Sequence, residues 1–225
     1  MNRLTQTYVI NLPDKDNWKI QRLCSSMKQH NVKIDYKIWK GVIVRDTPEI
    51  YEWAISNKLI KRSPNPKYGN IGAALAHITL WNKIAKHTDK KAIFFIMEDN
   101  ALMTPDTLEG IDIITKLQFD FLNARVLRPQ GNITQISNML KIKQKYVSEP
   151  IPNVWLSSYF VTPIGCDKLL SQIKKKQFDM SKTIIDRGVS IILHSSDING
   201  YIITDDKYFG HVETKNDTRR KENRS

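Results

Sequence analysis

The stretch Lys91-Ala-Ile-Phe-Phe-Ile-Met-Glu98-Asp99-Asn100 decides the fold class of this 225-residue chain. Six apolar residues, 92–97, run without a break and stop at two carboxylates. A short run rich in Ile and Phe predicts a strand buried on both faces, which belongs in the middle of an α/β sheet. Ligands of open α/β sheets bind outside the carboxyl ends of the strands. Glu98 and Asp99 are therefore candidate site residues, although such a pair can also simply cap a turn or stay solvated.

Length and composition favour one globular domain over residues 1–214, followed by a disordered basic tail over residues 215–225, which lacks apolar residues. The chain is 40% hydrophobic and 26% charged, as globular proteins are. It shows no apolar run long enough to span a membrane and no signal-peptide pattern at its start. The two cysteines, Cys24 and Cys166, form neither a disulfide framework nor a metal-binding spacing. We therefore expect a cytoplasmic protein with reduced thiols.

The formal net charge of +12 favours anionic partners, such as nucleotide phosphates or an anionic membrane surface that the protein contacts peripherally. Much of this charge lies in Lys174-Lys175-Lys176 and in the tail. No RNA-recognition, zinc-finger or helix-turn-helix signature accompanies it, so nucleic acid is not an expected partner.

Strands and helices are expected to alternate around the central strand. The helix over residues 17–30 has Trp18, Leu23 and Met27 among its apolar positions, and Thr47 and Asn70 are expected helix caps. The pattern predicts further strands at residues 8–12, 32–39, 119–127, 154–161, 189–193 and 200–204, and further helices at 47–59, 71–86, 104–116 and from 163 to the lysine run. Residues 131–152 follow no clear pattern.

The helix over residues 71–86 carries a stripe of very small residues, followed by a histidine. The stripe consists of Gly69, Gly72, Ala73 and Ala76, and His77 comes next. Small residues allow a ligand or a neighbouring backbone to approach closely, and tight packing of the helix on the sheet explains the same stripe. His77 is a candidate catalytic residue, although a lone helical histidine is often a hydrogen-bonded structural residue.

Four segments together resemble glycosyltransferase family 25, whose members include lipooligosaccharide-type galactosyl- and glucosyltransferases and collagen hydroxylysine galactosyltransferases. The resemblance covers about residues 7–190. Its segments are Tyr8-Val-Ile-Asn11-Leu12-Pro-Asp, Gly69-Asn-Ile-Gly72-Ala-Ala-Leu-Ala-His77-Ile-Thr-Leu-Trp81, Ile96-Met-Glu98-Asp99-Asn100-Ala101 and Ser157-Ser-Tyr159-Phe-Val-Thr-Pro-Ile-Gly165-Cys-Asp-Lys-Leu-Leu170. The resemblance implies a GT-A-like nucleotide-diphospho-sugar transferase fold, with a mixed central sheet flanked by helices. The third acid of the family's acidic motif is replaced by Asn100.

The resemblance implies transfer of a hexose, with inversion, from a nucleotide sugar such as a UDP-hexose to a hydroxyl of a glycan or glycoprotein. Two alternatives remain open at this point. A nucleotidyltransferase would use a similar sheet and acidic strand end, although the chain lacks a Gly-rich phosphate loop after its first strand. A catalytically inactive module that binds sugar nucleotides or glycans would tolerate Asn100 in place of the third acid.

The resemblance also implies roles for individual residues. The expected donor-binding residues are Asn11, Leu12, Gly69, Gly72, Glu98 and Asp99. A divalent cation, Mn²⁺ or Mg²⁺, would bridge protein oxygens and the donor diphosphate, with Asp99, Asn100 and His211 as its ligands. Inversion needs a base for the acceptor hydroxyl proton. Asp186 is the first candidate for this base, His77 the second and His211 the third.

Overall fold

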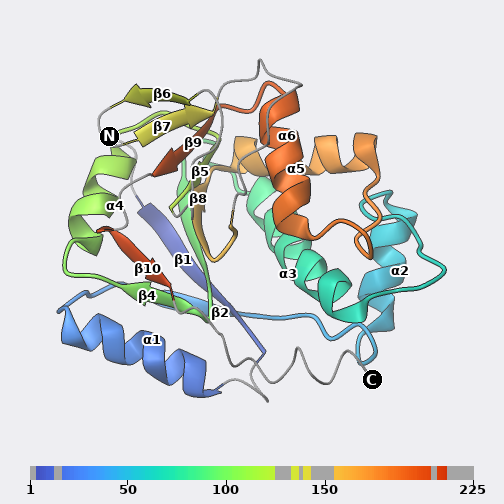
Figure 1. The fold of residues 1–225 in the computed structure, drawn as a ribbon, viewed down its shortest axis with the longest axis horizontal. Helices are drawn as coiled ribbons and strands as arrows, with labels where there is room; N and C mark the ends of the chain where they lie inside the picture. The colour runs from blue at the N-terminus through green and yellow to red at the C-terminus, as the bar shows by residue number, and fades with distance from the viewer. Residues whose placement is uncertain are drawn as a thin grey trace.

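The computed structural model describes residues 4–12, 17–124, 133–136, 139–142, 155–203 and 207–211. Within these residues, the fold is built on an eight-stranded mixed sheet with the order β2-β1-β3-β8-β5-β9-β7-β6 (Figure 1). Its strands are β1 (Leu4–Asn11), β2 (Tyr36–Lys40), β3 (Ile93–Glu98), β5 (Phe121–Asn123), β6 (Ile133–Ile136), β7 (Met139–Ile142), β8 (Ser158–Val161) and β9 (Gly200–Ile203). A small second sheet pairs β4 (Ala101–Met103) with β10 (Phe209–His211).

Strand β3 lies in the interior of the sheet, as its apolar run predicts. It pairs in parallel with β1 and antiparallel with β8. Phe94 and Ile96 pack into the hydrophobic cluster on one face of the sheet, and Ile93, Phe95 and Met97 pack into the cluster on the other. Both faces of the strand are therefore buried, and the strand exposes side chains only at its carboxyl end.

Helices cover both faces of the sheet, which confirms the predicted mixed sheet flanked by helices. The helices α2 (Pro48–Ser56), α3 (Tyr68–Ala85), α5 (Pro163–Lys176) and α6 (Ile185–Ser195) pack on one face, seen on the right in Figure 1. The helices α1 (Asn17–Gln29) and α4 (Thr107–Thr115) pack on the other face together with the β4–β10 pair. The start of α5 touches the sheet closely: a Cβ on Gly165 would lie 1.9 Å from the carbonyl oxygen of Asp120.

The strand predicted over residues 189–193 is wrong, because these residues belong to α6. A run of Val-Ser-Ile-Ile-Leu suits either structure when it is taken alone. The longer segment places buried Ile185, Val189, Ile192 and Leu193 at i, i+4, i+7 and i+8, which is the spacing of a helix that packs one face. Asp186 therefore lies in the first turn of a helix.

Several predicted boundaries also differ from the structure. The strand expected from residue 32 begins at Tyr36, because the backbone N–H of Val32 instead donates to Met27 at the end of α1. Of the strands predicted over residues 119–127 and 154–161, the described residues form β5 and β8, and residues 125–127 and 154 lie outside what the structure describes. Residues 133–136 and 139–142, for which we predicted no structure, form strands. The predicted tail over residues 215–225 lies outside the described residues.

Two predicted helix caps are wrong. The Thr47 hydroxyl donates backward to the carbonyl of Ile43 (3.0 Å) and does not cap α2. Asn70 lies within the first turn of α3, which begins at Tyr68. By contrast, the Thr162 hydroxyl accepts a hydrogen bond from the Gly165 N–H (3.0 Å) and caps α5.

Candidate active site

The site is built around the turn that leaves the carboxyl end of β3. Glu98 ends the strand, and Asp99 and Asn100 form the turn before β4. The N–H of Glu98 donates to the carbonyl of Ser157 (2.8 Å), and the N–H of Asp99 donates to the carbonyl of Ile10 (3.1 Å). The turn is therefore fixed between the end of β1 and the segment that enters β8.

A chain of buried, hydrogen-bonded side chains leads from Trp81 to Glu98. Trp81 Nε1 donates to the Tyr159 hydroxyl (2.9 Å), which lies 2.9 Å from His77 Nδ1. His77 Nε2 lies 3.3 Å from Glu98 Oε1. Because Nε2 faces a carboxylate it must carry a proton, so in the neutral ring Nδ1 accepts from Tyr159. The His77 side chain is 1% exposed and both of its nitrogens are engaged, so this placement suits a residue that positions Glu98.

Glu98 is held in its charged form although it lies in a largely enclosed setting. Burial by itself would raise the pKa of this carboxyl. The hydrogen bond and the electrostatic attraction from His77, with smaller contributions from Lys19 and the Asn100 side chain, outweigh burial and lower the pKa below its usual value. Glu98 is therefore a fixed negative charge at neutral pH.

Asp186 is brought to the same place by α6, far along the chain from β3. Burial and repulsion by the Glu98 carboxylate raise the pKa of Asp186 from 3.8 to about 7, although hydrogen bonds from the backbone of Leu156 and of Asp186 itself act in the opposite direction. A carboxyl group that exchanges its proton near neutral pH has the property required of a general base. The structure thus brings together Asp186, Glu98 and His77, which the sequence singled out separately.

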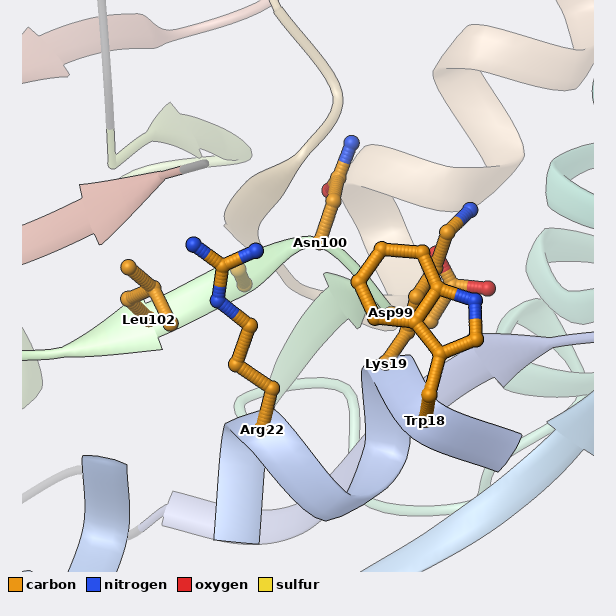
Figure 2. A pocket seen from close by; sticks show the side chains of 7 residues that line it. Trp18, Lys19, Arg22, Asp99, Asn100 and Leu102 are labelled. Carbon is orange, nitrogen blue, oxygen red and sulfur yellow. The ribbon is translucent and has the colours of Figure 1, made fainter. Parts of the chain in front are cut away.

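On the other side of the turn, α1 forms a small hollow against residues 99–102. The hollow is lined by Trp18, Lys19, Arg22, Asp99, Asn100, Ala101 and Leu102. Figure 2 shows Trp18, Lys19 and Arg22 extending from α1 toward this turn. Lys19 is 4% exposed, and its Nζ lies 3.5 Å from Asp99 Oδ1. Trp18 is 51% exposed, which reverses the prediction that it occupies an apolar position of the helix.

Four buried polar atoms at this edge of the sheet have no hydrogen-bond partner among the described residues. They are Asn11 Oδ1, Asn100 Oδ1, Ser157 Oγ and Ser158 Oγ. They come from the end of β1, the turn after β3 and the start of β8. Buried polar groups are normally satisfied by protein or by ordered water, so four together at one strand edge mark a place for ordered water or a polar ligand.

The remaining predicted site residues are placed less directly. Gly72 is buried against the loop after β2, where an added Cβ would lie 2.3 Å from the Val42 carbonyl oxygen, so its small size serves close packing. Gly69 is exposed in the first turn of α3, and Leu12 follows β1 beside Gly41. The backbone of His211 pairs with Ala101, next to Asn100, and its side chain lies outside what the structure describes. Donor contacts by Leu12, Gly69 and Gly72 stay predictions.

A divalent cation does not fit these side chains as they are arranged. Glu98 is bonded to His77, and Asp99 is paired with Lys19. The described part of the chain holds no group of three or more His, Cys, Asp or Glu side chains that could bind a metal ion. The free Asn100 Oδ1 offers one neutral oxygen, which is a weak ligand by itself. The described donor set by itself therefore does not fit a divalent cation, and the metal prediction, whose third ligand His211 has no described side chain, stays a prediction.

Sequence reasoning missed Lys19 as a site residue, although a signal was present. Lys19 is buried together with Leu23, Ser26 and Met27, which places it at the first position of the i, i+4, i+7, i+8 stripe of α1. A lysine at a buried position of an amphipathic helix needs a charged partner, so it points to a nearby carboxylate. Tyr159 and Trp81 stood in the family-like segments, but nothing in their spacing indicated that they meet at His77.

Comparison with known proteins identifies this chain as a glycosyltransferase. Residues 4–186 match the sequence profile described as glycosyltransferase family 25 (LPS biosynthesis protein). The chain belongs to this family, as the four segments predicted. No curated protein matches the chain.

Solved structures with a similar arrangement include transferases of related kinds. An inositol-1-phosphate CTP transferase from T. maritima is 10% identical, with 100% of this chain and 96% of that chain covered and a TM-score of 0.47. The apo form of the glycosyltransferase GlyE from Streptococcus pneumoniae is 10% identical, with 92% and 46% covered and a TM-score of 0.42. A putative glucose-1-phosphate thymidylyltransferase from Bacillus anthracis is 9% identical, with 96% and 92% covered and a TM-score of 0.43. The family assignment itself rests on the sequence match.

Among the described residues, no helix is both long enough and apolar enough to cross a membrane.

Proposed function

We propose that this glycosyltransferase moves a hexose, with inversion, from a nucleotide sugar such as a UDP-hexose to a hydroxyl of a glycan or glycoprotein. The observation that carries the proposal is the partly buried Asp186 carboxyl beside the fixed Glu98 charge, with a pKa of about 7. The description of the family as LPS biosynthesis proteins favours a glycan acceptor.

In the proposed reaction, Asp186 accepts the proton of the acceptor hydroxyl while the hydroxyl oxygen attacks the anomeric carbon. The bond from that carbon to the diphosphate oxygen breaks, and its electron pair leaves with the nucleoside diphosphate. The charge of Glu98 raises the proton affinity of Asp186. A hydrogen bond from His77 Nε2 to Glu98 Oε1 (3.3 Å) holds the Glu98 carboxylate in place.

The donor would lie over the free polar atoms at the strand edge. The side chains of Asn11, Ser157 and Ser158 offer hydroxyl and amide groups that suit the hydroxyls of a sugar or a ribose. Asp99, directly after the strand, would lie near the diphosphate. A cytoplasmic location and contact with an anionic membrane surface stay predictions.

The test is an assay of product and leaving group. Purified protein is incubated with a panel of nucleotide hexoses and glycan acceptors, and released nucleoside diphosphate is measured together with the anomeric configuration of the product. Asp186→Asn should lower turnover by roughly a hundredfold or more while donor affinity stays nearly unchanged. Asp112→Asn, an exposed carboxylate on α4, is the matched control.

Other outcomes of this assay would contradict the proposal. Release of pyrophosphate from a nucleoside triphosphate and a sugar phosphate would identify a nucleotidyltransferase. Donor binding without turnover would identify an inactive binding module. Full activity in Asp186→Asn would remove Asp186 from the role of base, and a collapse of donor affinity would make it a donor contact.

A further inference from the structure

We infer that two cations of α1, Lys19 and Arg22, bind the diphosphate of the donor in place of a divalent metal ion. The inference rests on the proposed function, because it assigns residues to the leaving group of that reaction. It starts from the hollow between α1 and the turn after β3, whose α1 side chains the proposed scheme leaves without a role.

The charges that line this hollow favour an anion. Lys19 and Arg22 contribute two positive charges, and Asp99 contributes one negative charge. The position next to Asp99, where the family resemblance implies a further acid, holds the neutral Asn100. A divalent cation placed here would face two cations across a single carboxylate, whereas a diphosphate would face two cations and one carboxylate. Among the side chains that line the hollow, the excess of positive charge therefore favours the diphosphate over a divalent cation.

Lys19 is placed as a built-in counter-ion. Its ammonium lies 3.5 Å from Asp99 Oδ1, and its charge also helps to lower the pKa of Glu98. Burying a lysine is costly unless its charge is used, and here one buried charge serves both acids at the end of β3. This ammonium offsets the charge of Asp99 and lowers the electrostatic cost of Glu98, so it weakens the repulsion that the two acids would exert on a diphosphate.

Arg22 lies one turn further along α1, so it faces the same side of the helix as Lys19. It is exposed, and Figure 2 shows its guanidinium extending from the helix toward β4. A guanidinium binds phosphate oxygens through two parallel hydrogen bonds, and an ammonium binds them as a point charge. Together the two residues supply what a bridging metal would supply: a fixed positive charge next to the oxygen that leaves.

The donor diphosphate leaves by the same step as in the proposed reaction. The bond between the anomeric carbon and the phosphate oxygen breaks, and its electron pair becomes the new charge on the diphosphate. Lys19 and Arg22 stabilise that charge, while the proton of the acceptor goes to Asp186. The Lys19 charge is held in place in advance by its burial and by Asp99, which is the condition for strong electrostatic stabilisation.

The test is calorimetric titration of the protein with UDP, in buffer containing EDTA and in buffer containing excess MnCl₂. We expect UDP to bind in EDTA with an affinity within roughly threefold of that in Mn²⁺. In EDTA, Lys19→Met and Arg22→Gln should each weaken UDP binding roughly tenfold or more, as loss of a charge-assisted hydrogen bond does. Lys28→Gln, on the last turn of the same helix, should bind like the unaltered protein. Uridine, which lacks phosphates, should bind equally to all four proteins.

The possible results separate this inference from the proposed function. UDP binding that requires Mn²⁺ would overturn the inference and leave the proposed function standing. Unchanged UDP affinity in Arg22→Gln and Lys19→Met would overturn it as well. Thermal unfolding shows whether each variant is folded. If Lys19→Met does not fold, the UDP affinity of Arg22→Gln tests the inference instead, because Arg22 is exposed and its replacement should not affect folding. If no nucleoside diphosphate of a full panel binds in either buffer, the proposed function fails together with the inference.

Discussion

Replacing Asp186 by Asn should make the protein more stable at the same time as it removes the proposed base. In the folded protein Asp186 holds its proton up to about pH 7, whereas an ordinary Asp releases it near 3.8. Between these values the folded state binds more protons than the unfolded state, so the contribution of Asp186 to stability falls as the pH rises. The amide of asparagine does not titrate in this range, so the stability of the variant does not fall with pH for this reason.

The size of the effect follows from the pKa. A carboxyl whose pKa rises from 3.8 to about 7 costs the folded state about 4 kcal/mol once it has ionised. The backbone hydrogen bonds that favour the carboxylate are retained only in part by an amide, so we expect a net gain of about 2 kcal/mol at about pH 8. For a chain of this length that gain corresponds to an increase of about 4–8 °C in melting temperature.

The measurement is thermal and urea unfolding of both proteins at several pH values between about 4.5 and 8.5. The difference in the free energy of unfolding should grow as the pH rises to about 7 and then level off. Asp112→Asn, which changes an exposed carboxylate, should show no such trend. A variant that is equally or less stable than the unaltered protein throughout this range would show that Asp186 is not held in a setting that opposes its charge.

Four further predictions concern the same site and its support. The rate at low donor concentration should rise with pH around a midpoint near 7, and a profile without a step near 7 would argue against Asp186 as the base. Asn100→Asp should make UDP binding depend more strongly on Mn²⁺ in calorimetry, because it adds a carboxylate beside Asp99. Tyr159→Phe should lower the free energy of unfolding by about 1–3 kcal/mol in urea, because it leaves an indole N–H buried without its acceptor. Gly165→Ala should cost about 4 kcal/mol or more, since its Cβ would meet a backbone carbonyl at 1.9 Å; wild-type-like unfolding would mean that α5 can move away.

The sequence predicted best those elements whose pattern is long or whose burial is complete. The apolar run of β3 and the capped start of α5 left little choice, and both lie where we predicted them. The short apolar run at residues 189–193 did not distinguish strand from helix, because only its spacing to Ile185 identifies the buried face of a helix. The alternation from Val32 was misleading, since those residues pack as an irregular segment before the edge strand β2.

The site was predictable to the extent that it follows from strand ends. Glu98 and Asp99 lie at the carboxyl end of a buried strand, and Asp186 was named from the family resemblance. The bonds that define their chemistry join residues distant in sequence, such as His77 to Tyr159 and Lys19 to Asp99. Such pairs depend on how α1 and α3 are rotated against the sheet, which a single sequence does not state.

The order of the strands also bears on how the protein is made. Lys19 belongs to the first helix and Asp186 to the last, while Glu98 lies near the middle of the chain. Strand β9, near the end of the described chain, inserts between β5 and β7. During synthesis a nascent chain can therefore form β1, β2 and β3 and bury much of their apolar surface before Asp186 has left the ribosome. A chain that ends before α6 lacks Asp186, so the proposed site is complete only after nearly all of the described chain has been made.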